Sequence, residues 1–182
     1  MEADLIAEGY NVQQASFTGA FGPEGEVFTF NGTVQEVTKQ VHEVNPDYNF
    51  SATDTGLEAR DWRDRRVART DCGFRDFARG YWINEGIKYL RYLNGRWGID
   101  PGTCSRVSCS WNSAIWVCFH PDGSSKRFEK DWQYVADYAD GIASGAWCPR
   151  EPQPYDPFTQ NLVRGKVWDP EGLSVSIRKD KC

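Results

Sequence analysis

Three side chains of the types that cleave RNA lie close together near the middle of the chain. His120, Arg127 and Glu129 could supply a base, a phosphate-binding cation and an acid. Most such sites use two acid–base groups, but the only other histidine, His42, lies far away in the sequence. His120 also stands beside Pro121 in an expected turn, where a histidine is more often a solvated surface residue than a base. We therefore predict that the protein has no catalytic site and is not an enzyme.

Other chemical motifs are absent from the sequence. There is no G-x-S-x-G, no H-E-x-x-H and no glycine-rich phosphate loop. The spacing Cys104-x4-Cys109-x8-Cys118 lacks the close cysteine pairs of zinc sites, so we predict neither metal nor cofactor. A glycosidase pair of carboxylates stays open, because Asp and Glu are abundant. Four tryptophans could stack on sugars, although such residues more often pack around disulfides: Trp82, Trp97, Trp111 and Trp147.

The cysteines are even in number and confined to one part of the chain. An even set of this kind predicts three intramolecular disulfides, with fifteen possible pairings. The pairing Cys104–Cys109 is disfavoured if both residues belong to one extended strand. Disulfides imply an oxidising destination, so we expect a secreted protein whose signal peptide is absent from this chain. The six residues are Cys72, Cys104, Cys109, Cys118, Cys148 and Cys182.

Charge divides the chain into two unequal parts. Residues 1–60 carry a net charge of −8 and residues 61–182 a net charge of +3, which together give the −5 of all 182 residues. An acidic solvated face or an acidic leader would explain the first part. A surplus of +3 is too small to predict nucleic-acid binding. No apolar run reaches the roughly 18 residues of a membrane span, and we expect a monomer.

Two processing signatures lie where the charge changes. Residues 57–60 (LEAR) match the LxxR pattern of kexin-type proteases and end at Arg60, and Arg65-Arg66 is a dibasic pair. We therefore predict a cysteine-free leader or pro-domain over 1–60, a linker over 61–71 and a disulfide-stabilised domain over 72–182. The alternative is an ordinary N-terminal domain that is never cut. Asn31 and Asn49 begin glycosylation sequons in or beside the leader.

Periodicity predicts mixed helices and strands. In the leader, a strand at 26–30 could pair with 11–18 and precede a helix that ends at Asn45-Pro46, which makes a small ββα unit. Beyond it, we expect a helix around 83–93 and a second helix that starts at the potential cap Asp131. Strands are expected at 105–110, 113–119, 125–128, 162–168 and 173–177. The strand at 113–119 is apolar on both faces, as in a central strand covered on both sides.

Residues 102–118 (GTCSRVSCSWNSAIWVC) are similar to a segment of small secreted cysteine-rich proteins of filamentous fungi. The stretches 86–91 (GIKYLR), 136–139 (ADYA) and 30–37 (FNGTVQEV) fit the same pattern. Two features differ: Cys118-Phe119-His120 replaces the usual Cys-Asn-Asp, and the extension 149–182 is longer than in the group. Such proteins are often candidate effectors of plant-associated fungi, and several share an α/β sandwich with fungal killer toxins. The order of the predicted elements already favours a disulfide-stabilised α+β fold, a two-layer sandwich of two helices on an antiparallel sheet, and this order is compatible with the sandwich of the resembled group.

Four functional hypotheses follow. The first is a secreted effector or virulence-type protein that binds a host or competitor protein and is made with a removable pro-domain. The second is a killer-toxin-like or antimicrobial protein that acts on cells. The third is a small secreted hydrolase, such as a ribonuclease, and the fourth is a polysaccharide-binding module.

Overall fold

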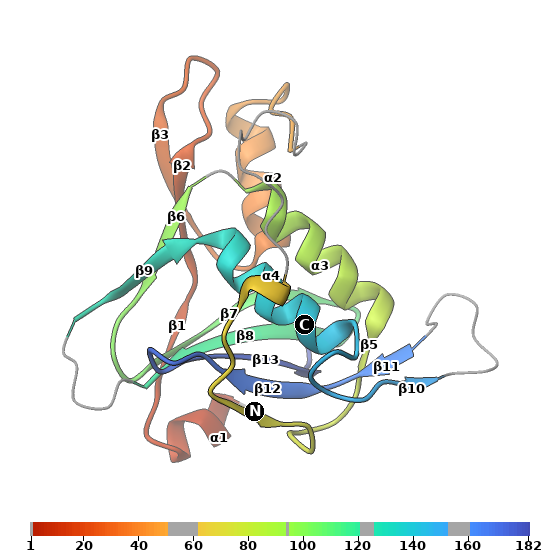
Figure 1. Cartoon of the computed structure of the whole chain (residues 1–182). Helices are drawn as coiled ribbons and strands as arrows, with labels where there is room; N and C mark the ends of the chain where they lie inside the picture. Colours follow the sequence, from red (N-terminus) through yellow and green to blue (C-terminus); the bar gives the residue numbers. More distant parts are fainter. Residues whose placement is uncertain (1, 51–61, 94, 121–125, 153–160) are drawn as a thin grey trace.

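A computed structural model of the protein describes residues 2–50, 62–93, 95–120, 126–152 and 161–182. Within these ranges the chain is a mixed α/β structure with four α-helices, three sheets and three disulfides (Figure 1). The mixed class agrees with the α+β prediction. The finer prediction of a two-layer sandwich with two helices on one sheet is not confirmed, because the strands divide among several sheets and a third helix also contacts the largest one.

The largest sheet has six strands and provides the frame for the rest of the molecule. Its central strands form an antiparallel hairpin joined to a third antiparallel strand. One edge strand is parallel to its neighbour, and it comes from the N-terminal part of the chain. In spatial order the strands are β1 (Asn11–Gln14), β7 (Thr103–Ser110), β8 (Ser113–Phe119), β13 (Leu173–Lys179), β12 (Gly165–Trp168) and β4 (Arg69–Asp71).

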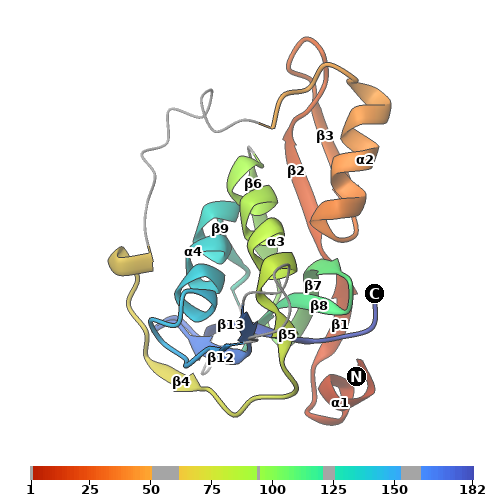
Figure 2. The same ribbon diagram turned by 90° about the vertical axis from the view of Figure 1, so that its right-hand side faces the viewer.

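Strand β8 is buried along its whole length, as its two apolar faces predicted. Helices α3 (Gly80–Tyr92) and α4 (Trp132–Ala143) lie on one side of the sheet, as Figure 2 shows. The predicted cap forms, because the Asp131 carboxylate accepts a hydrogen bond from the backbone N of Tyr134 at 2.8 Å. Gly86 allows α3 to approach β7, since a Cβ at this position would clash with Ser108 Oγ.

A smaller four-stranded sheet joins the N-terminal part to the rest of the chain. The predicted ββα unit forms as β2 (Ser16–Ala20), β3 (Val27–Asn31) and α2 (Val34–Val44), with a capping box between Thr33 and Glu36. Its first strand was expected over 11–18, but the segment divides at Ala15, and residues 11–14 pair with β7 in the largest sheet instead. β2 then pairs with a strand that the sequence analysis did not predict, β6 (Arg96–Ile99), which pairs in turn with β9 (Phe128–Asp131). The remaining elements are α1 (Glu2–Ala7), a 3-10 turn η2 (Trp62–Asp64), and a small sheet of β10 (Glu151–Pro152), β11 (Asn161–Val163) and β5 (Ala78–Arg79).

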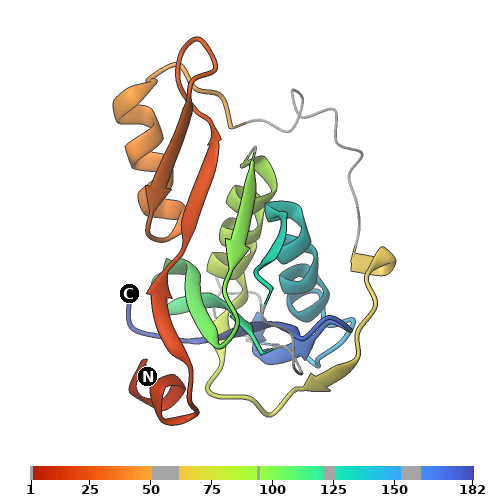
Figure 3. The ribbon, with the colours of Figure 1, turned by 90° about the vertical axis from the view of Figure 1, so that its left-hand side faces the viewer.

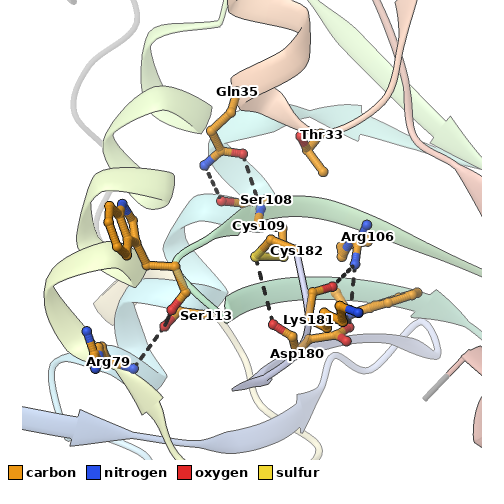
Figure 4. The surroundings of a disulfide bond; sticks show 12 residues. Thr33, Gln35, Arg79, Arg106, Ser108, Cys109, Ser113, Asp180, Lys181 and Cys182 are labelled. Carbon is orange, nitrogen blue, oxygen red and sulfur yellow. Dashed lines mark hydrogen bonds and ion pairs between the residues drawn. A yellow bond between two sulfur atoms is a disulfide. The ribbon is translucent and has the colours of Figure 1, made fainter.

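One hydrophobic core includes residues from both charge regions. Phe17 of β2 is fully buried and stacks on Trp132 of α4, with ring centroids 3.9 Å apart. Gln35 of α2 donates to Ser108 Oγ at 2.8 Å and accepts from the backbone N of Cys109 at 3.1 Å (Figure 4). Figure 3 shows β2, β3 and α2 beside β6 and α3. The N-terminal part therefore docks on the cysteine-bearing part through an apolar face, as expected of a unit too small to have its own core.

All six cysteines are paired. Cys72–Cys148 contacts the core beneath the helices, and Cys109–Cys182 fastens the C-terminus to the end of β7 (Figure 4). Cys104–Cys118 joins directly opposed residues of β7 and β8, whose Cα atoms lie 4.0 Å apart. The three disulfides confirm the predicted oxidation, and the disfavoured Cys104–Cys109 bond does not form.

Candidate functional site

The structure places the predicted acid–base residues in two separate surroundings. The exposed His120 follows β8, and its ring meets Tyr10 edge to face at 5.8 Å. Arg127 is held elsewhere, donating to Asp100 Oδ2 at 2.8 Å and lying 3.8 Å from Glu129 Oε1. Because two carboxylates neutralise Arg127, it is not a free phosphate-binding group beside His120. The lack of a catalytic site stays a prediction.

Arg65, half of the dibasic pair, makes structural contacts. Its Nη2 lies 2.8 Å from Asp137 Oδ2, and its guanidinium lies 4.4 Å from the centre of the Tyr134 ring. The backbone oxygen of Arg66 accepts a hydrogen bond from the Tyr138 hydroxyl at 2.6 Å. Contacts to α4 therefore hold this dibasic segment. Arg60, the other predicted processing residue, lies outside the described residues.

Asp137 is the acidic centre of this cluster. Its side chain is 1 % exposed, and burial raises its pKa from 3.8 to about 6, although the hydrogen bond and charge of Arg65, and the charge of Arg91, act in the opposite direction. Arg91 lies 3.5 Å from Asp137 and 2.8 Å from Asp140, which divides its charge between two carboxylates.

The two sequons differ in their surroundings. Asn31 is exposed at the end of β3, but the threonine of its sequon, Thr33, is buried as the cap of α2 and donates to Glu36 Oε2 at 2.9 Å. Asn49 is exposed, and its sequon runs into residues outside the described ranges. Glycosylation stays a prediction at both positions.

The four tryptophans proposed as sugar-stacking groups separate into core and surface. Trp97 is 4 % exposed and stacks on Trp132, with ring centroids 5.1 Å apart. Trp147 is half-buried and packs against the hydrophobic core. Trp82 and Trp111, however, stack on each other at the surface, with centroids 5.4 Å apart and ring planes 18° from parallel.

Trp82 and Trp111, with Tyr81, form an exposed group that we call the aromatic ledge. Trp111 is 66 % exposed and Tyr81 46 %. The Tyr81 and Trp82 rings lie 4.9 Å apart at an angle of 86°. Because neighbouring rings are turned by a right angle, the ledge is not one flat platform. The sequence analysis singled out the two tryptophans but missed Tyr81, which precedes Trp82 in the first turn of α3.

Backbone geometry holds Trp111 outward. Trp111 and Asn112 form the two-residue turn between β7 and β8, with φ angles of 49° and 57°. Two residues with positive φ match the twist of a hairpin, and Asn is common there, whereas a bulky ring is a costly choice. The turn is also fixed to the start of α3, because Ser113 Oγ accepts a hydrogen bond from the backbone N of Arg79 at 3.0 Å (Figure 4). The ledge is thus strained and rigidly supported, as functional side chains often are.

No protein-family model, curated protein or solved structure matches the chain. No helix among the described residues is long and apolar enough to cross a membrane. In the same residues, no group of three His, Cys, Asp or Glu side chains could hold a metal ion. The aromatic ledge is therefore chosen as the candidate functional site on the basis of its own geometry.

Proposed function

We propose that the protein is a secreted effector of virulence type, of fungal origin, which binds a host or competitor protein through the aromatic ledge. The observation that carries this proposal is Trp111, a tryptophan 66 % exposed at a strained turn position and stacked on Trp82. A large exposed ring contributes little to folding, so its presence at a costly backbone position supports a role in binding.

The composition of the ledge favours a protein partner. Tryptophan, tyrosine and arginine are the residues that contribute most often to protein–protein binding energy. The ledge has the two aromatic types, and the exposed Arg79 lies next to it in the chain and in hydrogen-bonded contact with the same hairpin. A polysaccharide chain, in contrast, is best matched by rings in one plane, and Tyr81 and Trp82 are at right angles.

Secretion, oligomeric state and the relation to killer toxins are the other parts of the proposal. Three disulfides suit an oxidising, extracellular destination. A distant relation to killer-toxin-like sandwiches agrees with helices that cover one side of the largest sheet. That the protein is a monomer stays a prediction. A killer-toxin-like or antimicrobial activity on cells is the second candidate, and leakage from target cells would distinguish it.

A pull-down experiment tests whether the ledge binds a partner. It needs a variant that removes the Trp111 ring and keeps the turn between β7 and β8. Trp111→Gly suits this purpose because glycine adopts positive φ without strain. The control is Val27→Thr, which changes a side chain 70 % exposed on β3. We expect a partner from plant apoplastic or cytosolic extract to be captured by the wild type and V27T and lost with W111G. Equal capture by all three, or capture on chitin or glucan instead, would contradict the proposed protein partner.

Removal of residues 1–60 as a pro-domain is a separate proposal. A kexin-type protease is expected to cut within 57–67, and the Arg65 and Arg66 contacts with α4 favour the site at Arg60 over the dibasic pair. The buried Phe17–Trp132 stack predicts that both fragments stay associated after the cut. Size exclusion under native conditions and electrophoresis under denaturing conditions test this prediction. Fragments that separate without denaturant would show that the docking is weak.

A further inference from the structure

The face of the central sheet that points away from α3 and α4 carries buried positive charge. Side chains alternate along a strand, so Val167 of β12 points to the helices and Lys166 to the opposite side. Lys166 is only 5 % exposed, and Arg178 of β13, on the same face, is 1 % exposed. In Figure 1, α1 and the segment near β4 lie below the sheet on this side.

Lys166 has aromatic neighbours but no anionic partner. Its Nζ lies 4.8 Å from the Trp168 ring centre, 5.1 Å from that of Phe74 and 5.8 Å from that of Tyr10. Within the described residues its ammonium group makes no hydrogen bond and no ion pair. A buried ammonium group without a counter-ion is unfavourable, and aromatic faces compensate for it only in part.

The ammonium group borders a cavity of about 610 Å³, in the size range of small-molecule sites. Arg69 lies 3.7 Å above the Trp168 ring on the same wall, which adds a second cation over an aromatic surface. The lining combines these cations with rings from four separate segments: Tyr10, Arg69, Phe74, His120, Lys166 and Trp168.

Three carboxylates, those of Glu8, Asp71 and Asp169, also line the cavity, and each has another partner. Glu8 pairs with Arg75 at 3.0 Å. Asp169 accepts hydrogen bonds from the Tyr134 hydroxyl at 2.7 Å and from the backbone N of Leu173 at 2.8 Å. Asp71 accepts from the backbone N of Gly73 at 3.1 Å. These carboxylates are therefore bound to other groups and do not pair with Lys166. Their negative charge would still repel a ligand that carries several negative charges.

Burial and neighbouring cations both disfavour the charged form of Lys166. Burial lowers the pKa of Lys166, the nearby charge of Glu8 opposes this as the next largest influence, and the charges of Arg178, Arg69 and Arg75 lower the pKa further. One negative charge placed in the cavity would stabilise the charged form of Lys166.

We propose that this cavity is a binding site for a small aromatic carboxylate, whose single negative charge pairs with Lys166 and whose ring packs among Tyr10, Phe74 and Trp168. A single negative charge is proposed because Lys166 makes no ion pair within the described residues, while the three lining carboxylates offset the charge of Arg69 and repel further negative charge. The ring follows from the aromatic lining. This site is independent of the aromatic ledge, since the two share no residue.

Calorimetric titration with benzoate tests the proposal directly. Benzamide serves as the neutral probe of the same shape and inorganic phosphate as the anion without a ring. We expect benzoate to bind the wild-type protein and to bind at least about tenfold more weakly to Lys166→Met, because a charge-assisted contact is lost. The control Lys88→Met removes an exposed lysine of α3 and should leave binding unchanged.

Three results would overturn the proposal. They are no benzoate binding to the wild type, equal binding to K166M, or binding of benzamide or phosphate as tight as that of benzoate. Circular dichroism confirms that K166M is folded. If it is not, Phe74→Leu provides the second variant, since it keeps the lysine and removes one ring from the wall. We expect F74L to weaken benzoate more than phosphate, and an equal effect on both probes would contradict the aromatic part of the proposal.

Discussion

On the helix side of the central sheet, β8 and β13 present apolar side chains at every position except Ser113 and Lys179, which pair with each other at the strand ends. The apolar residues are Ile115, Val117, Phe119, Leu173, Val175 and Ile177. On the opposite side the same two strands carry Trp116, a disulfide cysteine, two serines and Arg178, and all of these are buried as well. Both faces are thus closed to water, but only one excludes charge. Two faces that are equally buried can therefore differ in chemistry. The buried polar groups of the second face are available for contacts with a ligand, whereas the apolar face only packs.

The largest effect should come from the helix side. Trp132 is 1 % exposed and stacks on both Phe17 and Trp97, so it joins the N-terminal part to the rest of the core. Trp132→Ala is expected to lower the free energy of unfolding by about 3–5 kcal/mol. Urea denaturation measures this loss. Trp168→Ala, on the opposite side of the sheet and only half-buried, should cost clearly less, and equal losses would contradict the contrast between the faces.

Much of the helix side could be predicted from sequence, since its signals are local. The apolar stripe of α3 and the cap Asp131 of α4 were both read correctly. The strand β6 was missed, because a short strand has little periodic signal. The segment of β1 was expected to be a strand but with the wrong partner, because its true partner β7 lies far away in the chain.

The opposite side could not be predicted, because its features depend on long-range contacts. The hairpin containing Lys166 was expected, but the burial of this lysine depends on Tyr10 and Phe74, which come from separate loops. The Cys104–Cys118 bond likewise depends on the register between β7 and β8, which shifts near Val107. The predicted disulfides were thus correct in number, while their pairing stayed open.

The disulfides should show a second contrast between the faces. Cys72–Cys148, against the helix-side core, closes a loop with a sequence separation of 76, whereas Cys104–Cys118, on the other face, closes one of 14. Loop-closure entropy predicts losses of roughly 4 and 3 kcal/mol when each pair is replaced by alanine. Thermal unfolding of the two double variants provides the comparison. A larger loss for Cys104–Cys118 would mean that packing, not loop length, dominates.

A pH effect should arise from the buried carboxylate of α4. The pKa of Asp137 is raised from 3.8 to about 6 in the folded protein, so the folded state binds this proton more tightly than the unfolded state. Its contribution to stability is therefore present below about pH 4 and is lost as the pH rises through about 6. The full effect is about 3 kcal/mol, of which about 2 kcal/mol falls between pH 4.5 and pH 7. Urea denaturation of the wild type and Asp137→Asn at pH 4.5 and 7 measures how the free energy of unfolding of each protein changes with pH.

Glu36 provides a control of opposite sign for this titration. The hydrogen bond from the backbone of Thr33 lowers the pKa of Glu36, so its smaller contribution is present at neutral pH and lost on acidification. Glu36→Gln should therefore remove part of the acid-induced loss, whereas Asp137→Asn should remove the acid-induced gain. Equal pH slopes in the wild type and D137N would show that Asp137 is not titrating in this range.

For Arg178, the direction of the change in stability is more informative than its size. Its Nε and Nη2 atoms are buried and make no hydrogen bond within the described residues, although the guanidinium lies 4.7 Å from the Trp116 ring centre. Replacing a poorly paired buried charge by an apolar side chain of similar volume is often neutral or stabilising. We therefore expect Arg178→Met to change the free energy of unfolding by between zero and a gain of about 2 kcal/mol. Urea denaturation of the variant measures the change.

Arg106→Met is the matched control on the same face. Arg106 donates to the backbone oxygen of Lys181 at 2.9 Å and lies 3.9 Å from Asp180, so its loss should cost up to about 1 kcal/mol. If R178M is at least as stable as the wild type while R106M has a lower free energy of unfolding, the charge of Arg178 on the second face is not required for folding. If R178M loses more than R106M, Arg178 is a structural cation, and the charge on this face is explained by stability alone.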